Sequence, residues 1–144
     1  MNITYTNTLT PAEWNALRAA VGWGTIENSL AAKGLANTAF IVCARDGEKA
    51  VGMARILTDY AYAVYIADVI VTPEYQGKGI GGGVMSRIMA YIDENIARGQ
   101  SKVIALLAAK GKEGFYEKLG FTKRPTDEFG PGMSIKVQKK EATE

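Results

Sequence analysis

Five glycines stand within the seven residues from Gly77 to Gly83, between a stretch rich in β-branched residues and a long stretch with helical periodicity. A glycine inside a helix costs about 1 kcal/mol relative to alanine, so three in a row at a helix start require a reason. Backbone N–H groups in the first turn have no partner within the helix and carry the positive end of its dipole. Because glycine has no side chain, an anion can approach them closely. The cluster therefore predicts a strand, a phosphate-binding turn and a helix in succession.

Other interpretations of this cluster fit its context less well. Gly77, Gly79 and Gly82 have the spacing of a dinucleotide-binding fingerprint, but that fingerprint needs an acidic residue at the end of the next strand, and residues 107–109 are Leu-Ala-Ala. A Walker A loop needs Ser or Thr after Gly-Lys, whereas here Gly79 follows Lys78. A glycine-rich turn that serves tight packing alone remains the structural alternative.

The order of the remaining elements predicts an α+β fold. Thr10 and Glu13 form a capping box with Pro11 at the helix start, and a second helix from about Ile26 to Lys33 is expected to stop at Gly34. Alternation and turn residues predict strands over 39–45, 50–57, 62–71, 101–108, 121–123 and 133–137. Helical spacing predicts a long helix to about residue 98 and a short one over 111–119. We expect a mostly antiparallel mixed sheet of six to seven strands, flanked by about four helices, with one parallel crossover around the long helix.

Length and composition bound the class of protein. A chain of 144 residues, 47% of them hydrophobic, predicts one domain over residues 1–138 with a flexible polar tail over 139–144. Its apolar runs fall short of the roughly 18 residues that span a bilayer, and its first residues do not resemble a signal peptide, so we expect a cytoplasmic protein without membrane contact. A net charge of +2 gives little reason to expect nucleic acid as a partner.

Histidine is absent, which excludes serine-histidine and cysteine-histidine hydrolysis and argues against a metal site. Cys43 is the single cysteine and lies in an apolar run, where a buried inert thiol is expected. Any acid or base must therefore be Asp, Glu, Tyr, Lys or water.

Two segments resemble the GNAT acetyltransferase superfamily. The pattern Gln76-x-x-Gly79-x-Gly81, after a strand that ends in Val-x-Pro, is similar to the family's pyrophosphate-binding signature, and residues 114–121 resemble its closing segment, in which a helix carries Phe-Tyr and ends in Gly-Phe. The resemblance implies acetyl-CoA as cosubstrate and no metal. It also implies that backbone groups bind the coenzyme, through the pantetheine edge and the phosphate loop: Val69, Ile70, Val71, Gln76, Gly77, Lys78, Gly79, Ile80, Gly81 and Gly82.

The same resemblance implies two catalytic residues. Tyr116 matches the tyrosine that donates a proton to the coenzyme A sulfur, and a phenol with a pKa near 10 is protonated at neutral pH. The alternative is a tyrosine packed under the sheet with its hydroxyl in water. Asp68, which interrupts an apolar strand eight residues before Gln76, is the candidate base, with an outward-facing strand residue as the alternative.

The acceptor region has no diagnostic sequence. Aromatic residues interleaved with carboxylates suit a cationic amine with an apolar body, although core packing explains most of the aromatics equally well: Trp14, Trp23, Tyr60, Tyr62, Phe129 and Met133 with Glu27, Asp59, Asp127 and Glu128. We therefore expect transfer of the acetyl group to a primary amine of a small molecule by direct attack in a ternary complex. The alternatives are a protein lysine or N-terminal acetyltransferase, or a coenzyme A-binding regulator without catalysis. The resemblance also implies a possible homodimer.

Overall fold

A computed structural model describes residues 1–138 of the chain. It divides the chain into two compact units, one formed by Met1–Leu106 and the other beginning at Leu107. The predicted flexible tail, residues 139–144, lies outside the described residues.

The first unit contains a five-stranded mixed sheet in the order β1-β2-β3-β4-β5. Three neighbouring pairs are antiparallel, and β4 and β5 are parallel, as expected for a crossover around the long helix. The strands are β1 (Ile3–Thr6), β2 (Phe40–Asp46), β3 (Lys49–Thr58), β4 (Ala63–Val71) and β5 (Val103–Leu106). Strand β1 was not predicted, although three of its four residues are β-branched and it pairs with β2 along its whole length.

The predicted count of six to seven strands is wrong for the described residues. Residues 121–123 and 133–137 form no strand. In the second of these segments Met133, Ile135 and Val137 are 92%, 88% and 81% exposed. Their alternation satisfies the local requirement for a strand, but a strand also needs a neighbour with which to exchange hydrogen bonds. No neighbouring strand provides those bonds here.

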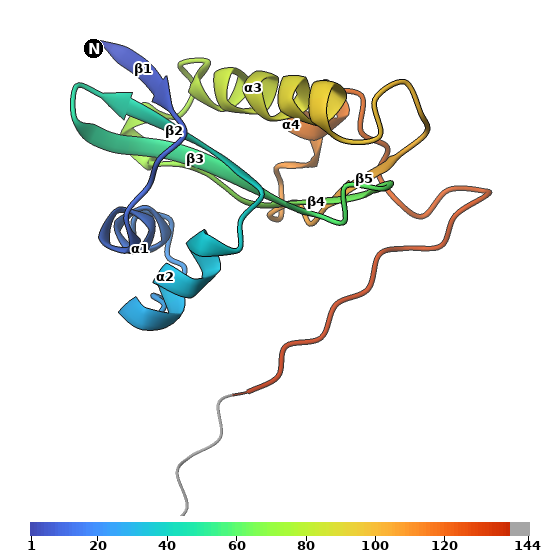
Figure 1. Ribbon diagram of the computed structural model, residues 1–144, viewed down its shortest axis with the longest axis horizontal. Coiled ribbons are helices and arrows are strands. Elements are labelled where there is room, and N and C mark those ends of the chain that lie inside the picture. The colour runs from blue at the N-terminus through green and yellow to red at the C-terminus, as the bar shows by residue number, and fades with distance from the viewer. Residues whose placement is uncertain (139–144) are drawn as a thin grey trace, which may run out of the picture. The chain divides into compact units, whose positions relative to one another are not determined.

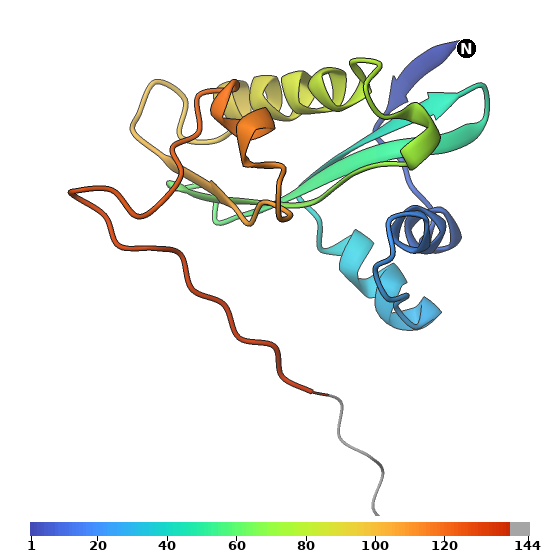
Figure 2. The same ribbon diagram turned by 180° about the vertical axis from the view of Figure 1, so that it is seen from behind.

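Helices cover both faces of the sheet in the first unit. Helix α3 (Ile80–Asn95) lies across one face, and α1 (Pro11–Ala20) and α2 (Asn28–Ala36) lie on the other, as Figures 1 and 2 show. The apolar stripe of α3 is buried against the sheet: Ile80, Val84, Met85, Ile88 and Ile92. No helix in the described part of the chain is long and apolar enough to cross a membrane.

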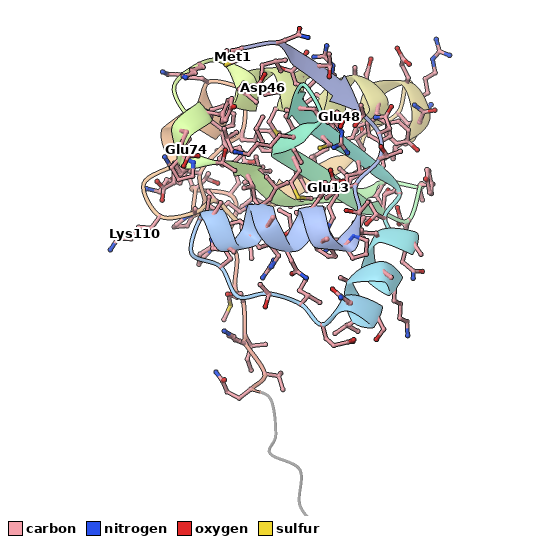
Figure 3. All side chains as sticks on the ribbon, turned by 90° about the vertical axis from the view of Figure 1, so that its left-hand side faces the viewer. Met1, Glu13, Asp46, Glu48, Glu74 and Lys110 are labelled. Atoms are coloured by element: carbon pink, nitrogen blue, oxygen red, sulfur yellow. The ribbon has the colours of Figure 1, made fainter. Side chains whose placement is uncertain are left out.

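Helix α1 begins as predicted. The Thr10 side chain accepts a hydrogen bond from the Glu13 N–H, and the Glu13 carboxylate accepts one from the Thr10 N–H at 3.0 Å. The same carboxylate accepts hydrogen bonds from both terminal nitrogens of Arg45 on β2, and these bonds connect α1 to the sheet. Glu13 is labelled in Figure 3.

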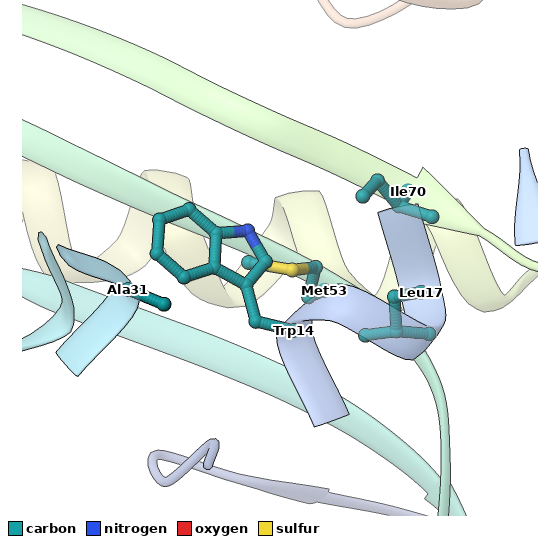
Figure 4. Packing of buried hydrophobic residues seen from close by; sticks show 5 residues of the cluster. All are labelled: Trp14, Leu17, Ala31, Met53 and Ile70. Atoms are coloured by element: carbon teal, nitrogen blue, oxygen red, sulfur yellow. The ribbon is translucent and has the colours of Figure 1, made fainter. Parts of the chain in front are cut away.

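The predicted end of the second helix at Gly34 is wrong. Helix α2 continues through Gly34 to Ala36, and Asn37 forms the cap. A methyl group at Gly34 would lie 3.2 Å from the six-membered ring of Trp14, so this glycine permits close packing rather than a helix stop. In Figure 4 the Trp14 indole lies between Ala31 and Met53, with its nitrogen on the side away from Ala31. These residues, with Leu17 and Ile70, form the core beneath α1 and α2.

The second unit contains the short helix α4 (Glu113–Glu117) and otherwise irregular chain up to residue 138. The helix is followed by Gly120 with a φ of 98°, a conformation that glycine adopts readily. The ring of Tyr116 makes edge-to-face contacts with Phe115 and Phe121.

Candidate active site

The chain between β4 and α3 is held at its start by two side-chain hydrogen bonds. A short 3-10 turn, η1 (Pro73–Tyr75), follows Thr72, and the Tyr75 hydroxyl donates to the Asp46 carboxylate at 2.6 Å; Asp46 is labelled in Figure 3. The Gln76 side-chain amide donates to the Val71 carbonyl oxygen at 2.8 Å. These bonds fix where the glycine segment leaves the sheet.

The glycine segment presents a run of free backbone donors. Gly77 and Gly79 have φ values of 75° and 82°, in the left-handed region, and Gly79 caps α3 without any side-chain hydrogen bond. Among residues 1–138, no backbone carbonyl accepts from any N–H between Gly77 and Gly82, and the first such bond of the helix runs from Gly83 N–H to Gly79 oxygen at 3.1 Å. Successive N–H groups at a helix start form a site for an anion.

Neighbouring glycines of this segment have different roles. A methyl group built at Gly82 would meet no atom within 4 Å, whereas one at Gly83 would lie 2.0 Å from the hydroxyl oxygen of Tyr5. Gly83 therefore permits the approach of Tyr5, while Gly82 leaves open space beside the free N–H groups. The Ile80 side chain is buried in the core at 3% exposure, so only its backbone can serve a ligand.

Strand β4 offers a second set of backbone groups. Its parallel pairing with β5 runs from Ala63 opposite Val103 to Ile66 opposite Leu106, where β5 ends. Strand β4 continues for five more residues to Val71. No other strand in the described chain borders it on that side. An extended ligand could therefore pair with this edge, which contains the predicted Val69, Ile70 and Val71; Ile70 is in the core, so its contribution is again through the backbone.

Asp68 lies where β4 bulges. Between the pairs Met53–Ile70 and Arg55–Ala67, β4 has one more residue than β3, and Asp68 has a φ of 53°. Positive φ is uncommon for residues other than glycine, although aspartate tolerates it better than most. The carboxylate accepts hydrogen bonds from Arg18 on α1 at 3.0 Å and from Arg55 on β3 at 2.7 Å. Asp68 is therefore not an outward-facing strand residue but the centre of an ion-pair cluster.

Tyr116, in the second unit, is 8% exposed. Burial raises the pKa of its phenol above the ordinary value near 10. The hydroxyl is therefore protonated at neutral pH, as the predicted role of proton donor requires.

Cys43 is fully buried, and burial raises the pKa of its thiol to about 11, which confirms the prediction of an inert cysteine.

These features can be compared with known proteins. A family model described as an acetyltransferase (GNAT) domain matches residues 36–123, which is more than half of the chain. The chain belongs to the GNAT acetyltransferase family. This confirms the family resemblance of the glycine segment and of the segment around Tyr116.

Solved and curated relatives agree with this assignment. The crystal structure of a probable acetyltransferase of unknown function from meticillin-resistant Staphylococcus aureus has 31% sequence identity and a TM-score of 0.84, covering 94% of this chain and 100% of that one. GCN5-related N-acetyltransferase 2 from the chloroplast of Arabidopsis thaliana is 37% identical over 86 residues, 56% of this chain and 31% of that protein. The rice chloroplast protein named serotonin N-acetyltransferase 2 is 39% identical over 75 residues, 52% of this chain and 36% of that protein. The GNAT chain thus spans about a third of the length of these two plant proteins.

Acetyltransferases of the GNAT family use acetyl-CoA as cosubstrate. The residues of this chain fit that molecule, since free N–H groups suit a diphosphate and the unpaired edge of β4 suits an extended arm carrying amides. Within residues 1–138, no three His, Cys, Asp or Glu side chains gather as a metal site.

Within the first unit of this GNAT chain, Asp59 and Tyr62 line one surface cavity, and the other predicted acceptor residues of that unit are not among its lining residues. Trp14 belongs to the core at 2% exposure. The carboxylate of Glu27 accepts from the N–H groups of Ser29 and Leu30, and that of Asp59 accepts from three N–H groups of its own turn. A hydrogen bond from the Ser29 hydroxyl, together with these N–H groups, lowers the pKa of Glu27, and the three backbone hydrogen bonds lower the pKa of Asp59. Phe129 and Met133 are exposed and lie in the second unit.

Arg18 and Arg55 were missed by sequence reasoning. They lie on different elements, 37 positions apart in the numbering, and neither belongs to a motif. The only available signal was the charge of Arg55 within the buried stretch of β3, which requires a partner in the fold.

Proposed function

We propose that this chain transfers the acetyl group of acetyl-CoA to a primary amine of a small molecule, by direct attack of the amine in a ternary complex. The observation that carries the proposal is the run of backbone N–H groups without a backbone acceptor from Gly77 to Gly82, at the start of α3. It is supported by membership of the GNAT family. The rice relative is named for serotonin, a small primary amine, which supports a small acceptor.

The residues of the chain would divide the work between binding and proton transfer. Bound acetyl-CoA supplies an activated thioester carbonyl. The N–H groups of the glycine segment hold its diphosphate, with Gly79 and Gly82 leaving the space for close approach. The edge of β4 from Ala67 to Val71 orients the arm, since β5 leaves that edge free. Such positioning makes the reaction effectively unimolecular.

We assign Tyr116 as the proton donor to the departing thiolate. Its raised pKa keeps the phenol protonated, and general acid catalysis of this kind contributes about 100-fold or more to a rate.

We assign Asp68 a positioning role, which differs from the role of base expected from the sequence. Both of its oxygens already accept hydrogen bonds from guanidinium groups, so it orients Arg18 and Arg55. In this proposal the amine proton passes to solvent water.

The test is an acceptor panel with acetyl-CoA, in which products are identified by mass spectrometry. The panel contains arylalkylamines, amino sugars, amino acids and a lysine peptide, and each is run with the wild type, Tyr116→Phe and Tyr91→Phe. Tyr91→Phe is the matched control, because it also loses one hydroxyl, whose hydrogen bond to Tyr60 lies on the outside of α3. We expect Tyr116→Phe to lower kcat about 100-fold with coenzyme A affinity unchanged, and Tyr91→Phe to have wild-type kcat.

Two outcomes would count against this function. Tight binding of coenzyme A without turnover on any acceptor would favour a regulator without catalysis. Turnover of the lysine peptide alone would favour a protein acetyltransferase.

A further inference from the structure

Three charged side chains from three separate elements form one group, here called the arginine–aspartate cluster: Arg18 of α1, Arg55 of β3 and Asp68 of β4. The side chains are 21%, 14% and 10% exposed, respectively. Arginine remains charged at any physiological pH, so two guanidinium groups face one carboxylate and the cluster carries an excess positive charge. A partly buried excess charge is costly unless something balances it.

The arginines retain donors that nothing in the described chain uses. Arg18 donates through Nε to the Gly24 carbonyl oxygen at 2.7 Å and through Nη1 to Asp68, and Arg55 donates through Nε to Asp68 and through Nη1 to Thr38. Among residues 1–138, no acceptor is bonded to the Nη2 atom of either arginine. The fully buried side-chain atoms without a partner are Trp14 Nε1 and Thr72 Oγ1 in the described chain, so the two Nη2 atoms reach solvent. Two accessible guanidinium nitrogens therefore stand ready to donate.

A third donor beside them also lacks an acceptor. The Arg55 guanidinium lies 4.7 Å from the centre of the Trp14 ring. The Trp14 Nε1 atom is buried without a hydrogen-bond partner in the described chain. A buried donor left unsatisfied costs about 1–3 kcal/mol. The surroundings of Arg55 thus have more donors than acceptors, which is the composition of a site for an oxygen-bearing anion.

The cluster also lies next to the unpaired edge of β4. Asp68 immediately precedes Val69, and its φ of 53° stores strain at this point of the strand. Strained residues of this kind persist where the surrounding structure holds them, often at functional sites. Arg18 belongs to α1, and the Arg55 guanidinium lies over the ring of Trp14 from the same helix, so both are on the side of the sheet that carries α1. Figure 1 shows α1 and α3 on opposite faces of the sheet.

We propose that the arginine–aspartate cluster binds the acid group of the acceptor, so that the acceptor is an amine that also carries a carboxylate or a phosphate. This inference rests on the proposed acetyl transfer. A single anionic group would balance the excess charge, and the planar guanidinium groups match the geometry of both anions. A cationic amine without an acid group would meet positive charge here, which opposes the acceptor expected from the sequence.

The experiment compares acceptors that differ only in the acid group. Tyrosine is paired with tyramine for the carboxylate, and glucosamine 6-phosphate is paired with glucosamine for the phosphate. We expect the wild type to favour the acid-bearing member of one pair at least tenfold in kcat/KM, and the pair that shows the preference identifies the anion. Arg18→Gln should reduce this preference at least tenfold, measured as the ratio of kcat/KM between the two members of the pair. Arg18→Lys keeps the charge but loses the planar guanidinium group, so its preference for the acid-bearing acceptor should lie between those of the wild type and Arg18→Gln.

Arg98→Gln is the matched control, because it removes one exposed guanidinium beyond the end of α3. It should leave both members of each pair unchanged. Equal kcat/KM for acid-bearing and neutral acceptors in the wild type would overturn the inference while leaving acetyl transfer intact. An Arg18→Gln variant that slows both members equally would also overturn it, since that result indicates a structural role.

A binding measurement separates the two proposals if no acceptor is acetylated. Inorganic phosphate is titrated into protein saturated with coenzyme A, which occupies the glycine segment. A rise in Tm for the wild type that Arg18→Gln abolishes and Arg98→Gln retains would support an anion site, even though the proposed function had failed. No rise in the wild type would overturn the anion site as well.

Discussion

The glycine segment before α3 and the arginine–aspartate cluster both offer donors to an anion, but they are built differently. The first uses backbone N–H groups of six consecutive residues, from Gly77 to Gly82. The second uses guanidinium groups from α1 and β3, gathered by a carboxylate on β4. Both lie in the first unit and both border β4, one after its end and the other at its bulge.

The difference in construction implies a difference in sensitivity. Donors of the backbone kind depend on φ and on the absence of side-chain volume, so they should fail when a methyl group is added. Donors of the side-chain kind depend on charge and geometry, and the loss of one partner leaves other charges buried and unpaired. Substitutions at each site therefore distinguish the two kinds of donor.

Asp68→Asn should produce the largest loss of stability. Asparagine keeps the shape and tolerates positive φ, but it leaves two guanidinium groups without their carboxylate, for an expected loss of about 3 kcal/mol in the free energy of unfolding. Urea denaturation measures this loss. Asp93→Asn, at an exposed position on α3, is the control and should change stability by less than about 0.5 kcal/mol. Unchanged stability together with lost activity would instead indicate that Asp68 is a base.

Gly83→Ala should destabilise the protein by steric contact alone. The added methyl would lie 2.0 Å from the Tyr5 hydroxyl oxygen, and that ring is held by the Arg87 guanidinium at 3.7 Å. Forced shifts of this kind cost about 1–3 kcal/mol. Combining the change with Tyr5→Ala should recover part of the loss, measured as a double-mutant cycle. Strict additivity of the two changes would show that Tyr5 is not the obstacle.

Glu13→Gln provides a reference for the cluster, because Glu13 and Arg45 form a pair without excess charge. The hydrogen bond from Arg45 lowers the pKa of Glu13 from 4.5 to about 2 in the folded protein. A lowered pKa contributes stability above the unfolded value, and this stability is lost as the pH falls toward the folded value. We expect the free energy of unfolding of the wild type to exceed that of Glu13→Gln by about 1 kcal/mol at pH 7. This difference should disappear between about pH 5 and pH 2, and urea denaturation at each pH measures it. An advantage that is independent of pH would contradict this assignment.

Sequence reasoning reached the parts of this molecule that are local in the chain. The capping box of α1, the strands that became β2 and β3, and the order of strand, glycine segment and helix each depend on neighbouring residues. The backbone part of the predicted site belongs to the same group, since its features lie within consecutive residues.

The parts that could not be predicted depend on distant residues. Gly34 resembles a helix stop until Trp14 is seen to pack against it. The segment 133–137 alternates like a strand but has no neighbour in the sheet. Asp68 was singled out as a break in an apolar strand, yet its partners Arg18 and Arg55 lie 50 and 13 residues away in the chain, so the cluster appears only in the fold.

The most direct test of the account is Gly82→Ala, in which coenzyme A affinity and thermal stability are measured on the same protein. The added methyl meets no atom of the protein, and alanine favours a helix over glycine, so we expect a small rise in Tm, equivalent to about 0.5–1 kcal/mol. Because the methyl occupies the space beside the free N–H groups, we expect the Kd for coenzyme A from calorimetry to rise at least tenfold. The predicted result is higher thermal stability together with weaker binding of coenzyme A. An unchanged Kd would contradict the claim that these N–H groups hold the diphosphate.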